Sequence, residues 1–385
     1  MDADMETDDI EQRYNLANYD DESDDYLENE EPGGRDGLLG LADLTVHASN
    51  EEDSYLDRTA GDEDSEDERE NMEIRETDNL LLIGHVTGDA PLLEVHVHNE
   101  EDFYPHHEVV LPAYPLSLQC LSLPDLPNCV ATADFTPDVC IWNLDVLNLL
   151  EPVLKLTGVH KDSVLSLSWN GEEKLASGGA DHRVVLWDVR SGKSVSKLKR
   201  FKEKVQSIAF QPNERECLLI GDCSGCVTLS DTRSPTNKKQ WCLPESPEVE
   251  CVLWDEERTS AFFVSTDSGE VYCMDNRTDA PVYSIKAHSD AVTAVAQSLV
   301  RNCLVTVSAD KSLKVWNIRD ADKASFVTEH PQIRVGRILS LAAHPERPFV
   351  FAIGGDAPSD NYRVIDVSLL KAVQQSFELK EYKRS

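Results

Sequence analysis

The sequence predicts an all-β fold in which one structural unit is repeated seven times around a ring. Seven times a short apolar strand ends in a Trp-Asp-like dipeptide, most clearly in LeuTrpAspValArg at Leu186–Arg190. The positions equivalent to Trp are His98, Trp142, Trp187, Ser230, Met274, Trp316 and Ile365, with gaps of 44, 45, 43, 44, 42 and 49 residues. A period of about 40–45 residues that ends in Trp-Asp is typical of a four-stranded blade. We therefore predict a seven-bladed WD-repeat β-propeller over residues 78–377, behind an acidic disordered N-terminal arm.

The repeat that ends at Trp187 shows how the residues build one blade. Short runs of β-branched and aliphatic residues alternate with Gly, Asp and Asn turn signals, which is the pattern of consecutive antiparallel strands. From the inner to the outer edge of the blade, the predicted strands are Val164–Trp169, Lys174–Gly178, Arg183–Val189 and Ser194–Lys199.

Two repeats carry the same four polar residue types at matched positions. The sets are His160, Ser177, Asp181 and Trp187, and His288, Thr306, Asp310 and Trp316. A satisfied chain from indole to hydroxyl to imidazole to carboxylate would stiffen a buried blade and fix its strand register. Ser, His and Asp also form hydrolase triads, but here the indole would engage the hydroxyl and no GxSxG motif is present. We therefore predict a structural network, no catalytic residues and no enzyme.

The other repeats lack this set. In the fourth repeat Phe201, Ser224 and Ser230 replace the His, Asp and Trp, and in the fifth Met274 replaces the Trp. We expect these blades to be held by apolar packing alone and to be the softer part of the ring.

The first repeat is incomplete. Asn79–His85, Leu92–His98 and Pro105–Leu111 supply three strands, but the acidic residues before them are unsuited to an inner strand. An unpaired strand edge is an aggregation risk, so another segment must cover it. One candidate is the stretch after Leu370, which the seventh blade needs as its own outer strand. The other is Gly37–Ser49, the only apolar island in the arm, which we expect to dock on the propeller.

The charge is concentrated in the N-terminal arm. The chain has 72 acidic and 36 basic residues, and residues 1–77 hold 29 of the acidic residues against five Arg. Such a segment cannot bury enough apolar surface to offset its ordering entropy, so we predict a disordered interaction arm that repels nucleic acid. The remainder carries a charge of −12 and offers no general nucleic-acid footprint. Residues 378–385 form a short basic end.

The cysteines indicate a reducing compartment. No run of 18 apolar residues occurs, and the acidic N-terminus is unlike a signal or transit peptide. We therefore predict that the ten cysteines are reduced thiols of a cytosolic or nuclear protein. Cys223 and Cys226 form one CxxC pair, which lacks a second pair for zinc and flanks a tight turn.

No cofactor or metal is predicted. His96, His98, His106 and His107 lie close in the sequence, but no carboxylate or Cys completes a defined ligand set. The phosphate-binding motifs GxxxxGK[ST] and GxGxxG are absent, so nucleotide binding is not supported.

Function is expected on the faces of the ring. Loop residues just before inner strands should line one face and are candidate partner contacts: Lys161, Asp162, Glu203, Lys204, Ser289 and Asp290. In the arm, Ser65 and Ser54 precede acidic residues and are candidate phosphorylation sites.

Arg190 completes a Trp-Asp-x-Arg box. It resembles the box that substrate receptors of cullin-4 ubiquitin ligases present to their adaptor, which makes Arg190 a candidate ligase-adaptor contact. The alternative is a surface ion pair that closes the third strand, as Arg233, Arg277 and Arg319 in the same place indicate. We favour the ion pair.

Several motifs outside the repeat signature match one known family. They are TyrAsnLeuAlaAsnTyrAspAsp at Tyr14, LeuLeuGlyLeu at Leu38, LeuGluValHisVal at Leu93, ProAlaTyrPro at Pro112 and SerThrAspSerGlyGluValTyr at Ser265. On these residues the chain resembles the periodic tryptophan protein 1 family over most of its length. The resemblance implies a nuclear and nucleolar protein tied to ribosome assembly, rRNA processing or ribosomal-DNA chromatin.

The resemblance and the charge together imply a class of partner. We expect a non-enzymatic scaffold, monomeric within larger complexes, whose arm contacts basic proteins such as ribosomal proteins, assembly factors or histones. Nucleic acid would be contacted only locally or indirectly, and membranes not at all. A cullin-4 substrate receptor and a histone-binding chromatin regulator are the alternatives. Family members carry a lysine-rich insert where this chain passes directly from Leu156 to Val159, so nuclear entry would rest on Lys380, Lys383 and Arg384 or on a partner.

Overall fold

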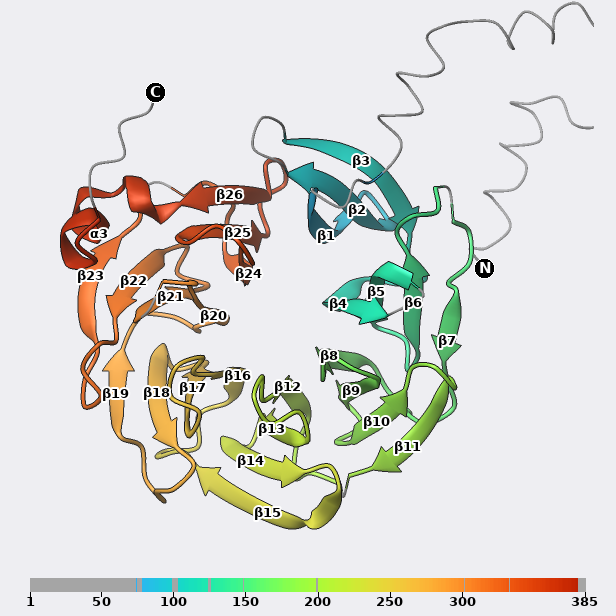
Figure 1. The fold of residues 1–385 in the computed structure, drawn as a ribbon, viewed down its shortest axis with the longest axis horizontal. Coiled ribbons are helices and arrows are strands. Elements are labelled where there is room, and N and C mark those ends of the chain that lie inside the picture. Colours follow the sequence, from blue (N-terminus) through green and yellow to red (C-terminus); the bar gives the residue numbers. More distant parts are fainter. Residues whose placement is uncertain are drawn as a thin grey trace, which may run out of the picture. The chain divides into compact units, whose positions relative to one another are not determined.

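In the computed structural model, seven antiparallel β-sheets surround a common axis as the blades of a propeller (Figure 1). Residue 74 and residues 78–379 are described, without 99–102, 124–125, 148, 199, 301 and 332; of 126–127 and 235–237 only the backbone is described. The predicted seven-bladed propeller is confirmed. The arm with Ser54, Ser65 and Gly37–Ser49, and the basic residues after 379, lie outside the described part.

The first four sheets follow one another in chain order. The first sheet contains β1 (Asn79–Thr87), β2 (Ala90–His98) and β3 (Phe103–Val110). The second contains β4 (Pro115–Leu123), β5 (Leu126–Asp134), β6 (Val139–Asn143) and β7 (Leu154–Leu156). The third contains β8 (Val164–Trp169), β9 (Lys174–Gly179), β10 (Val184–Asp188) and β11 (Lys193–Lys197). The fourth contains β12 (Val205–Phe210), β13 (Cys217–Asp222), β14 (Cys226–Asp231) and β15 (Ser234–Cys242).

The last three sheets complete the ring. The fifth contains β16 (Val249–Trp254), β17 (Ala261–Thr266), β18 (Glu270–Asp275) and β19 (Tyr283–Lys286). The sixth contains β20 (Ala294–Gln297), β21 (Cys303–Val307), β22 (Leu313–Asn317) and β23 (Ser325–Glu329). The seventh contains β24 (Ile338–Ala343), β25 (Val350–Gly355) and β26 (Tyr362–Asp366).

The core lies in the seams between neighbouring sheets. Successive side chains of a strand point to opposite faces, so each blade contributes to two seams. In β9, for example, Leu175 packs with residues of the second blade and Ala176 with residues of the fourth. This is why the middle strands are buried on both faces and read as nearly continuous apolar runs. Among the described residues, apolar clusters join the first blade to the second and so on to the seventh, but none joins the seventh to the first.

A series of serine hydroxyls links the inner strands of successive blades. Ser117 Oγ of β4 accepts a hydrogen bond from the Leu167 backbone N–H of β8 at 3.1 Å. In the same way Ser166 accepts from Ile208 N–H, and Ser207 from Val252 N–H, each at 3.1 Å. Each bond ties an inner strand to the next blade. The sequence signal, a serine followed by an aliphatic residue in β4, β8, β12 and β24, is too short to have been predictive.

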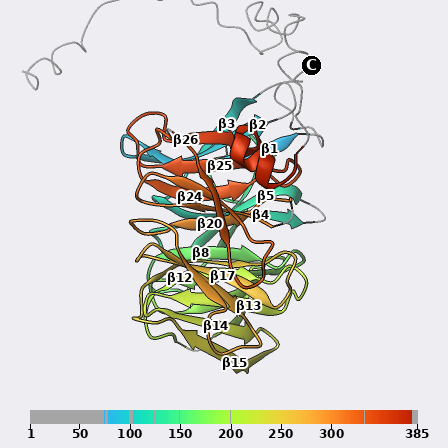
Figure 2. The same ribbon diagram turned by 90° about the vertical axis from the view of Figure 1, so that its left-hand side faces the viewer.

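The seventh blade ends in a helix, so the prediction of an outer strand after Leu370 is wrong. After β26 the chain forms η4 (Val367–Leu369), capped by the Asp366 carboxylate, and then α3 (Lys371–Ser376). The helix buries Val373, and the Phe377 ring lies 5.5 Å from that of Phe349. A helix suits this stretch because its apolar residues cover the end of an existing seam. Figure 2 views this outer side of the ring, where α3 lies.

No helix in the described part of the chain is long and apolar enough to cross a membrane.

Candidate functional site

The predicted residues of the third blade form one continuous hydrogen-bonded chain. Trp187 Nε1 donates to Ser177 Oγ at 2.8 Å, and Ser177 Oγ lies 2.8 Å from His160 Nε2. His160 Nδ1 lies 3.0 Å from Asp181 Oδ1. The other carboxylate oxygen of Asp181 accepts from the backbone N–H of Lys161 at 3.1 Å. The chain therefore runs from the interior of the blade to a loop on the ring face.

The sixth blade repeats this geometry. Trp316 Nε1 donates to Thr306 Oγ1 at 3.0 Å, and Thr306 Oγ1 lies 2.8 Å from His288 Nε2. His288 Nδ1 lies 3.1 Å from Asp310 Oδ2, which also accepts from the Ser289 backbone N–H at 3.1 Å. The Thr306 hydroxyl accepts from the indole, so it is free to donate to His288. A neutral imidazole protonated on Nδ1 therefore satisfies every member of the chain.

Electrostatics of the sixth blade agree with a neutral histidine beside an ionised aspartate. Burial lowers the pKa of His288 and outweighs the opposing effect of the Asp310 carboxylate. Burial acts to raise the pKa of Asp310, but hydrogen bonds from Ser312 and the Ser289 N–H, together with His288, lower it to about 2. The hydroxyl is held between Trp and His inside the blade, which leaves it without access to a substrate.

All six candidate partner residues are exposed on loops that lead into inner strands. Lys161 and Asp162 precede β8, Glu203 and Lys204 precede β12, and Ser289 and Asp290 precede β20. These loops share one ring face because the blades repeat the same strand order. Two of the three loops are anchored by the carboxylate of a network, through Lys161 and Ser289. The networks thus hold part of this rim in a fixed conformation.

The other blades are fastened in different ways from those predicted. In the second blade Trp142 Nε1 donates to Thr132 Oγ1 at 3.0 Å, so half of the network persists there. The fourth and fifth blades do not rely on apolar packing alone. The Trp254 indole donates to the Ala209 carbonyl at 3.1 Å and the Trp241 indole to the Thr278 carbonyl at 2.7 Å, both across the seam. Neither tryptophan lies in a third strand, where the repeat places its Trp, and Trp254-Asp255 ends the inner strand β16, so the repeat pattern did not predict these bonds.

Arg190 and its counterparts lie in turns after third strands. The Arg233 and Arg277 guanidinium groups pair with Asp231 and Asp275 of their own turns, at 2.9 and 2.5 Å. Arg190 is exposed, and its backbone N–H donates to Asp188 Oδ1 at 2.9 Å. The favoured ion pair thus forms at Arg233 and Arg277 but is not found at Arg190 among the described contacts. The shared feature is a turn in which the Asp or Asn two residues earlier accepts from the backbone N–H of the arginine.

The histidines do not assemble into a metal site in the described part of the chain. His106 and His107 contact each other, with Nδ1 atoms 2.7 Å apart, and His96 bonds Glu94. No group of three or more His, Cys, Asp or Glu residues among those described could hold a metal ion.

The expectation that all ten cysteines are reduced is wrong for one pair. Cys226 and Cys242 form a disulfide. They lie directly opposite each other on β14 and β15, with Cα atoms 4.1 Å apart, which places their side chains within bonding distance. In the sequence, Cys226 is grouped with Cys223 in a CxxC pair. The sequence does not show which residue of β15 lies opposite Cys226 in the hairpin. Cys223 is a free thiol.

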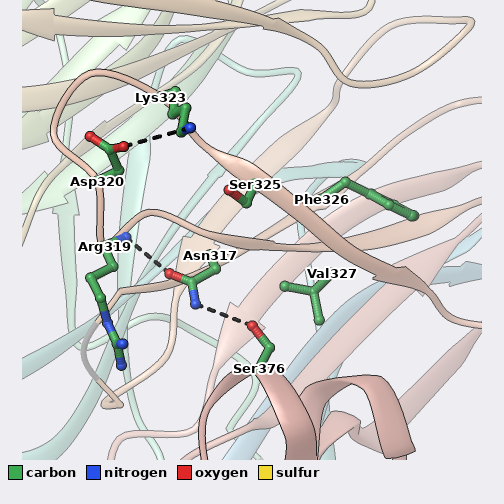
Figure 3. A pocket seen from close by; sticks show the side chains of 8 residues that line it. All are labelled: Asn317, Arg319, Asp320, Lys323, Ser325, Phe326, Val327 and Ser376. Atoms are coloured by element: carbon green, nitrogen blue, oxygen red, sulfur yellow. Dashed lines mark hydrogen bonds and ion pairs between the residues drawn. The ribbon is translucent and has the colours of Figure 1, made fainter.

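An open pocket lies between the sixth blade and α3 (Figure 3). It encloses about 330 Å³ and is lined by Asn317, Arg319, Asp320, Lys323, Ser325, Phe326, Val327 and Ser376. Several of its polar groups bond one another, such as Asn317 with Ser376 at 3.1 Å, as the dashed lines in Figure 3 show. Its walls offer no converging set of free polar groups for a ligand.

Comparison with known proteins agrees with the two networks. The family WD domain, G-beta repeat matches residues 151–188 and 279–317, which contain the two complete networks. The chain is 34% identical over 322 residues to the Periodic tryptophan protein 1 homolog of Drosophila melanogaster, covering 77% of this chain and 69% of the relative. It is 27% identical over 457 residues to Periodic tryptophan protein 1 of Saccharomyces cerevisiae, covering 97% and 78% of the two chains.

The ring of blades, the networks and the repeat match define a WD-repeat scaffold protein. The similarity to the fly and yeast proteins extends well beyond the two matched repeats. The chain belongs to the periodic tryptophan protein 1 family, as its motifs outside the repeats indicated.

Proposed function

We propose that this chain is a non-enzymatic scaffold of ribosome biogenesis that acts in the nucleolus. Its task would be rRNA processing and large-subunit assembly, or transcription of ribosomal-DNA chromatin. The observation that carries the proposal is membership of the periodic tryptophan protein 1 family, which the resemblance links to these processes. The absence of a catalytic constellation from the two networks is consistent with a binding role.

The rim suggests how such a scaffold binds. Its exposed residues carry both charges, with Lys161 and Lys204 beside Asp162, Glu203 and Asp290. A rigid ring offers a broad face on which several proteins can be held at once. Mixed charges on anchored loops favour specific protein contacts over a general attraction to polyanions.

Nucleic acid contact, if made by the ring, has one favoured place. The loop that leads into β12 contains three exposed cations close in sequence: Arg200, Lys202 and Lys204. Lys238 adds its ammonium 5.1 Å from the Phe201 ring of the same loop. Because the ring as a whole is acidic, such a contact would be local and secondary to protein contacts.

Depletion with rescue tests the proposal. Cells depleted of the protein should show delayed pre-rRNA processing or reduced rRNA synthesis in pulse labelling, and the wild-type chain should restore it. A rim variant, Lys161→Glu with Lys204→Glu, should fold but rescue poorly, because it reverses charge on the proposed partner face. Arg190→Ala, in a turn away from this rim, is the matched control and should rescue fully.

Two outcomes would overturn the proposal. Unchanged rRNA synthesis and processing, with no co-sedimentation of the protein with pre-ribosomal particles, would remove the ribosomal role. Failure of Arg190→Ala with full rescue by the rim variant would move the binding surface away from the rim.

A further inference from the structure

The first blade lacks its inner strand, which the register of its strands shows. In the second to fifth and the seventh blades, the pairing of the inner with the second strand shifts register at the start of the inner strand. In the third and sixth blades, the third and fourth strands shift register just before Trp187 and Trp316. The pairing of β1 with β2 has no shift, and that of β2 with β3 shifts between Val95 and His96. Thus β1 is a second strand, and His96, rather than His98, occupies the Trp position.

Packing against the second blade also identifies β1 as a second strand. In second strands β9 and β13, Gly178 and Gly221 each lie against the first residue of the next inner strand, Val205 and Val249. In β1, Gly84 lies in the same way against Pro115, the first residue of β4. Figure 1 shows β1 farther from the centre of the ring than the inner strands β4 and β24 on either side.

The apolar side chains beside the gap left by the missing strand are less buried than their counterparts in other blades, and Ile74, which precedes β1, packs against the same cluster. The four aliphatic residues of β1, Leu80–Ile83, are only half-buried, whereas the corresponding strand β9 is buried from Leu175 to its end. Leu118 of β4 is half-buried, whereas Leu167 at the same place in β8 is buried. In the described chain, β1 has β2 as its one strand neighbour, so its other edge presents unpaired backbone groups.

The series of serine hydroxyls has no serine in β16 and β20, where Cys251 and Ala294 take the position, and it resumes at β24 beside the missing strand. Ser340 of β24 follows the register shift as Ser166 and Ser207 do in their strands. Yet Ser340 is exposed and its hydroxyl has no hydrogen-bond partner among the described residues, and no hydroxyl among them accepts from the Leu118 N–H. An inner strand in the gap would accept from Leu118 and donate to Ser340.

Outside the gap the closing seam is polar but intact. The Tyr362 hydroxyl lies 3.5 Å from His96 Nε2, and Asn79 Nδ2 donates to Glu346 Oε2 at 3.3 Å. The His98 and His344 rings lie 5.6 Å apart. The seventh and first blades therefore meet through β1, β2, β26 and the loop between β24 and β25.

We propose that residues Gly37–Ser49 of the arm supply this inner strand by β-addition to β1. Four of the six described inner strands have a hydroxyl residue followed by an aliphatic one at this place: Ser117-Leu118, Ser166-Leu167, Ser207-Ile208 and Ser340-Leu341. In β16 and β20 the pairs are Cys251-Val252 and Ala294-Val295. Thr45-Val46 provides the same pair in the one apolar stretch of the arm. Thr45 would accept from Leu118 N–H, and Val46 N–H would donate to Ser340.

The length of chain between Ser49 and Asn79 permits this arrangement. An inner strand runs antiparallel to the second strand, so its end lies near the start of β1. The 29 residues between Ser49 and Asn79 can close that loop, and lengthening a loop costs little additional entropy. Because the segment belongs to the same chain, its effective concentration at the gap is high, which favours it over a second copy or another protein.

Hydrogen–deuterium exchange of the full-length chain tests the proposal. Amides of residues 37–49 should exchange at least about tenfold more slowly than those of residues 14–27 of the same arm, because a paired strand is protected. Val46→Asp should remove that protection and speed exchange of β1 amides by about tenfold. Leu27→Asp, a matched substitution elsewhere in the arm, should change neither.

Each other result overturns the proposal. Exchange of residues 37–49 as fast as the rest of the arm shows that the segment is not paired, even if Val46→Asp fails to fold. Protected β1 amides with an unprotected segment assign the gap to a second copy or a foreign strand, which the mass in sedimentation would distinguish. Protection that persists in Val46→Asp places the segment elsewhere.

Discussion

Two buried serines differ in what their hydroxyl groups are expected to contribute to stability. Ser177 accepts from the Trp187 indole and contacts His160 Nε2, both at 2.8 Å. Ser230, equally buried, has a hydroxyl without a partner among the described residues. The cost of removing a hydroxyl is set mainly by the groups it leaves unsatisfied, so the two serines should respond differently.

We expect Ser177→Ala to lower the free energy of unfolding by about 1–3 kcal/mol, because it leaves a buried indole N–H and an imidazole nitrogen without a hydrogen-bond partner. Ser230→Ala, the matched control, should change it by less than about 0.5 kcal/mol, since no partner is lost. Chemical denaturation of both variants and the wild type measures the difference. Equal losses would show that the network adds nothing to stability.

We expect His288 to make stability fall in mild acid. The folded chain keeps His288 neutral by burial, so its pKa lies below the unfolded value of 6.5. The unfolded chain therefore binds more protons as the pH falls below 6.5, and the stability contributed by the neutral residue declines. Between pH 7.5 and 5.5 the denaturation midpoint of the wild type should fall more steeply than that of His288→Gln. Parallel slopes would contradict this.

Asp310 acts in a separate pH range. Its pKa is lowered to about 2, so its contribution is present above the unfolded value of 3.8 and is lost as the pH falls toward 2. The change in stability between pH 7.5 and 5.5 therefore contains no contribution from the titration of Asp310.

At the scale of elements, the seams between blades depend on small residues where inner strands approach. A Cβ added to Gly178 of β9 would lie 2.6 Å from Val205 Cγ1 of β12, which is closer than atoms can pack. The backbone of Gly178 is outside the left-handed region, so the restriction comes from the neighbouring blade and not from the chain conformation.

We expect Gly178→Ala to cost about 1–3 kcal/mol of stability by overpacking. Val205→Ala should also destabilise, by leaving a cavity. The double variant should lose less than the sum of the two, because the new methyl fills space that the valine vacates. A double-mutant cycle by denaturation measures this coupling, and strict additivity would show that the two residues do not share the seam.

The terminal helix is the second element with a testable role. We expect Phe377→Ala to lower stability by about 1–3 kcal/mol, because it removes a half-buried ring that packs on Phe349. Gln375→Ala, on the exposed side of α3, is the control and should have little effect. Thermal unfolding compares the two; equal midpoints would mean that α3 does not secure the seventh blade.

At the scale of the whole molecule, charge separates the chain into two parts. The arm holds 29 acidic residues in its 77, while the ring is far less acidic for its length. Contacts of the arm with basic proteins should depend on salt, since exposed charges are screened within about 8–10 Å at physiological ionic strength.

We expect deletion of residues 1–36, which retains Gly37–Ser49, to weaken binding to immobilised core histones without changing the unfolding midpoint. These residues include 15 Asp and Glu, so the loss should be large at 50 mM salt and small at 500 mM, where screening is strong. Binding that is unchanged at low salt would show that the arm is not the contact.

The sequence by itself determined the ring, the number of blades and the two complete networks. Strand periodicity and turn residues are local properties, and the spacing of Trp187, Trp316 and their counterparts repeats them often enough to be unambiguous. The strands of the third blade were predicted to within two residues for the same reason. A pattern within one blade is encoded within about 40–45 residues.

Only the tertiary structure decided what joins distant parts of the chain. The disulfide of Cys226 with Cys242, the indole bonds of Trp241 and Trp254 across a seam, and the series of inner-strand serines depend on pairing between strands or blades. The identity of β1 as a second strand also required its neighbours, because an isolated strand carries no mark of its distance from the ring axis. Contacts across seams join residues some 40 positions apart or more, and a linear pattern does not contain that geometry.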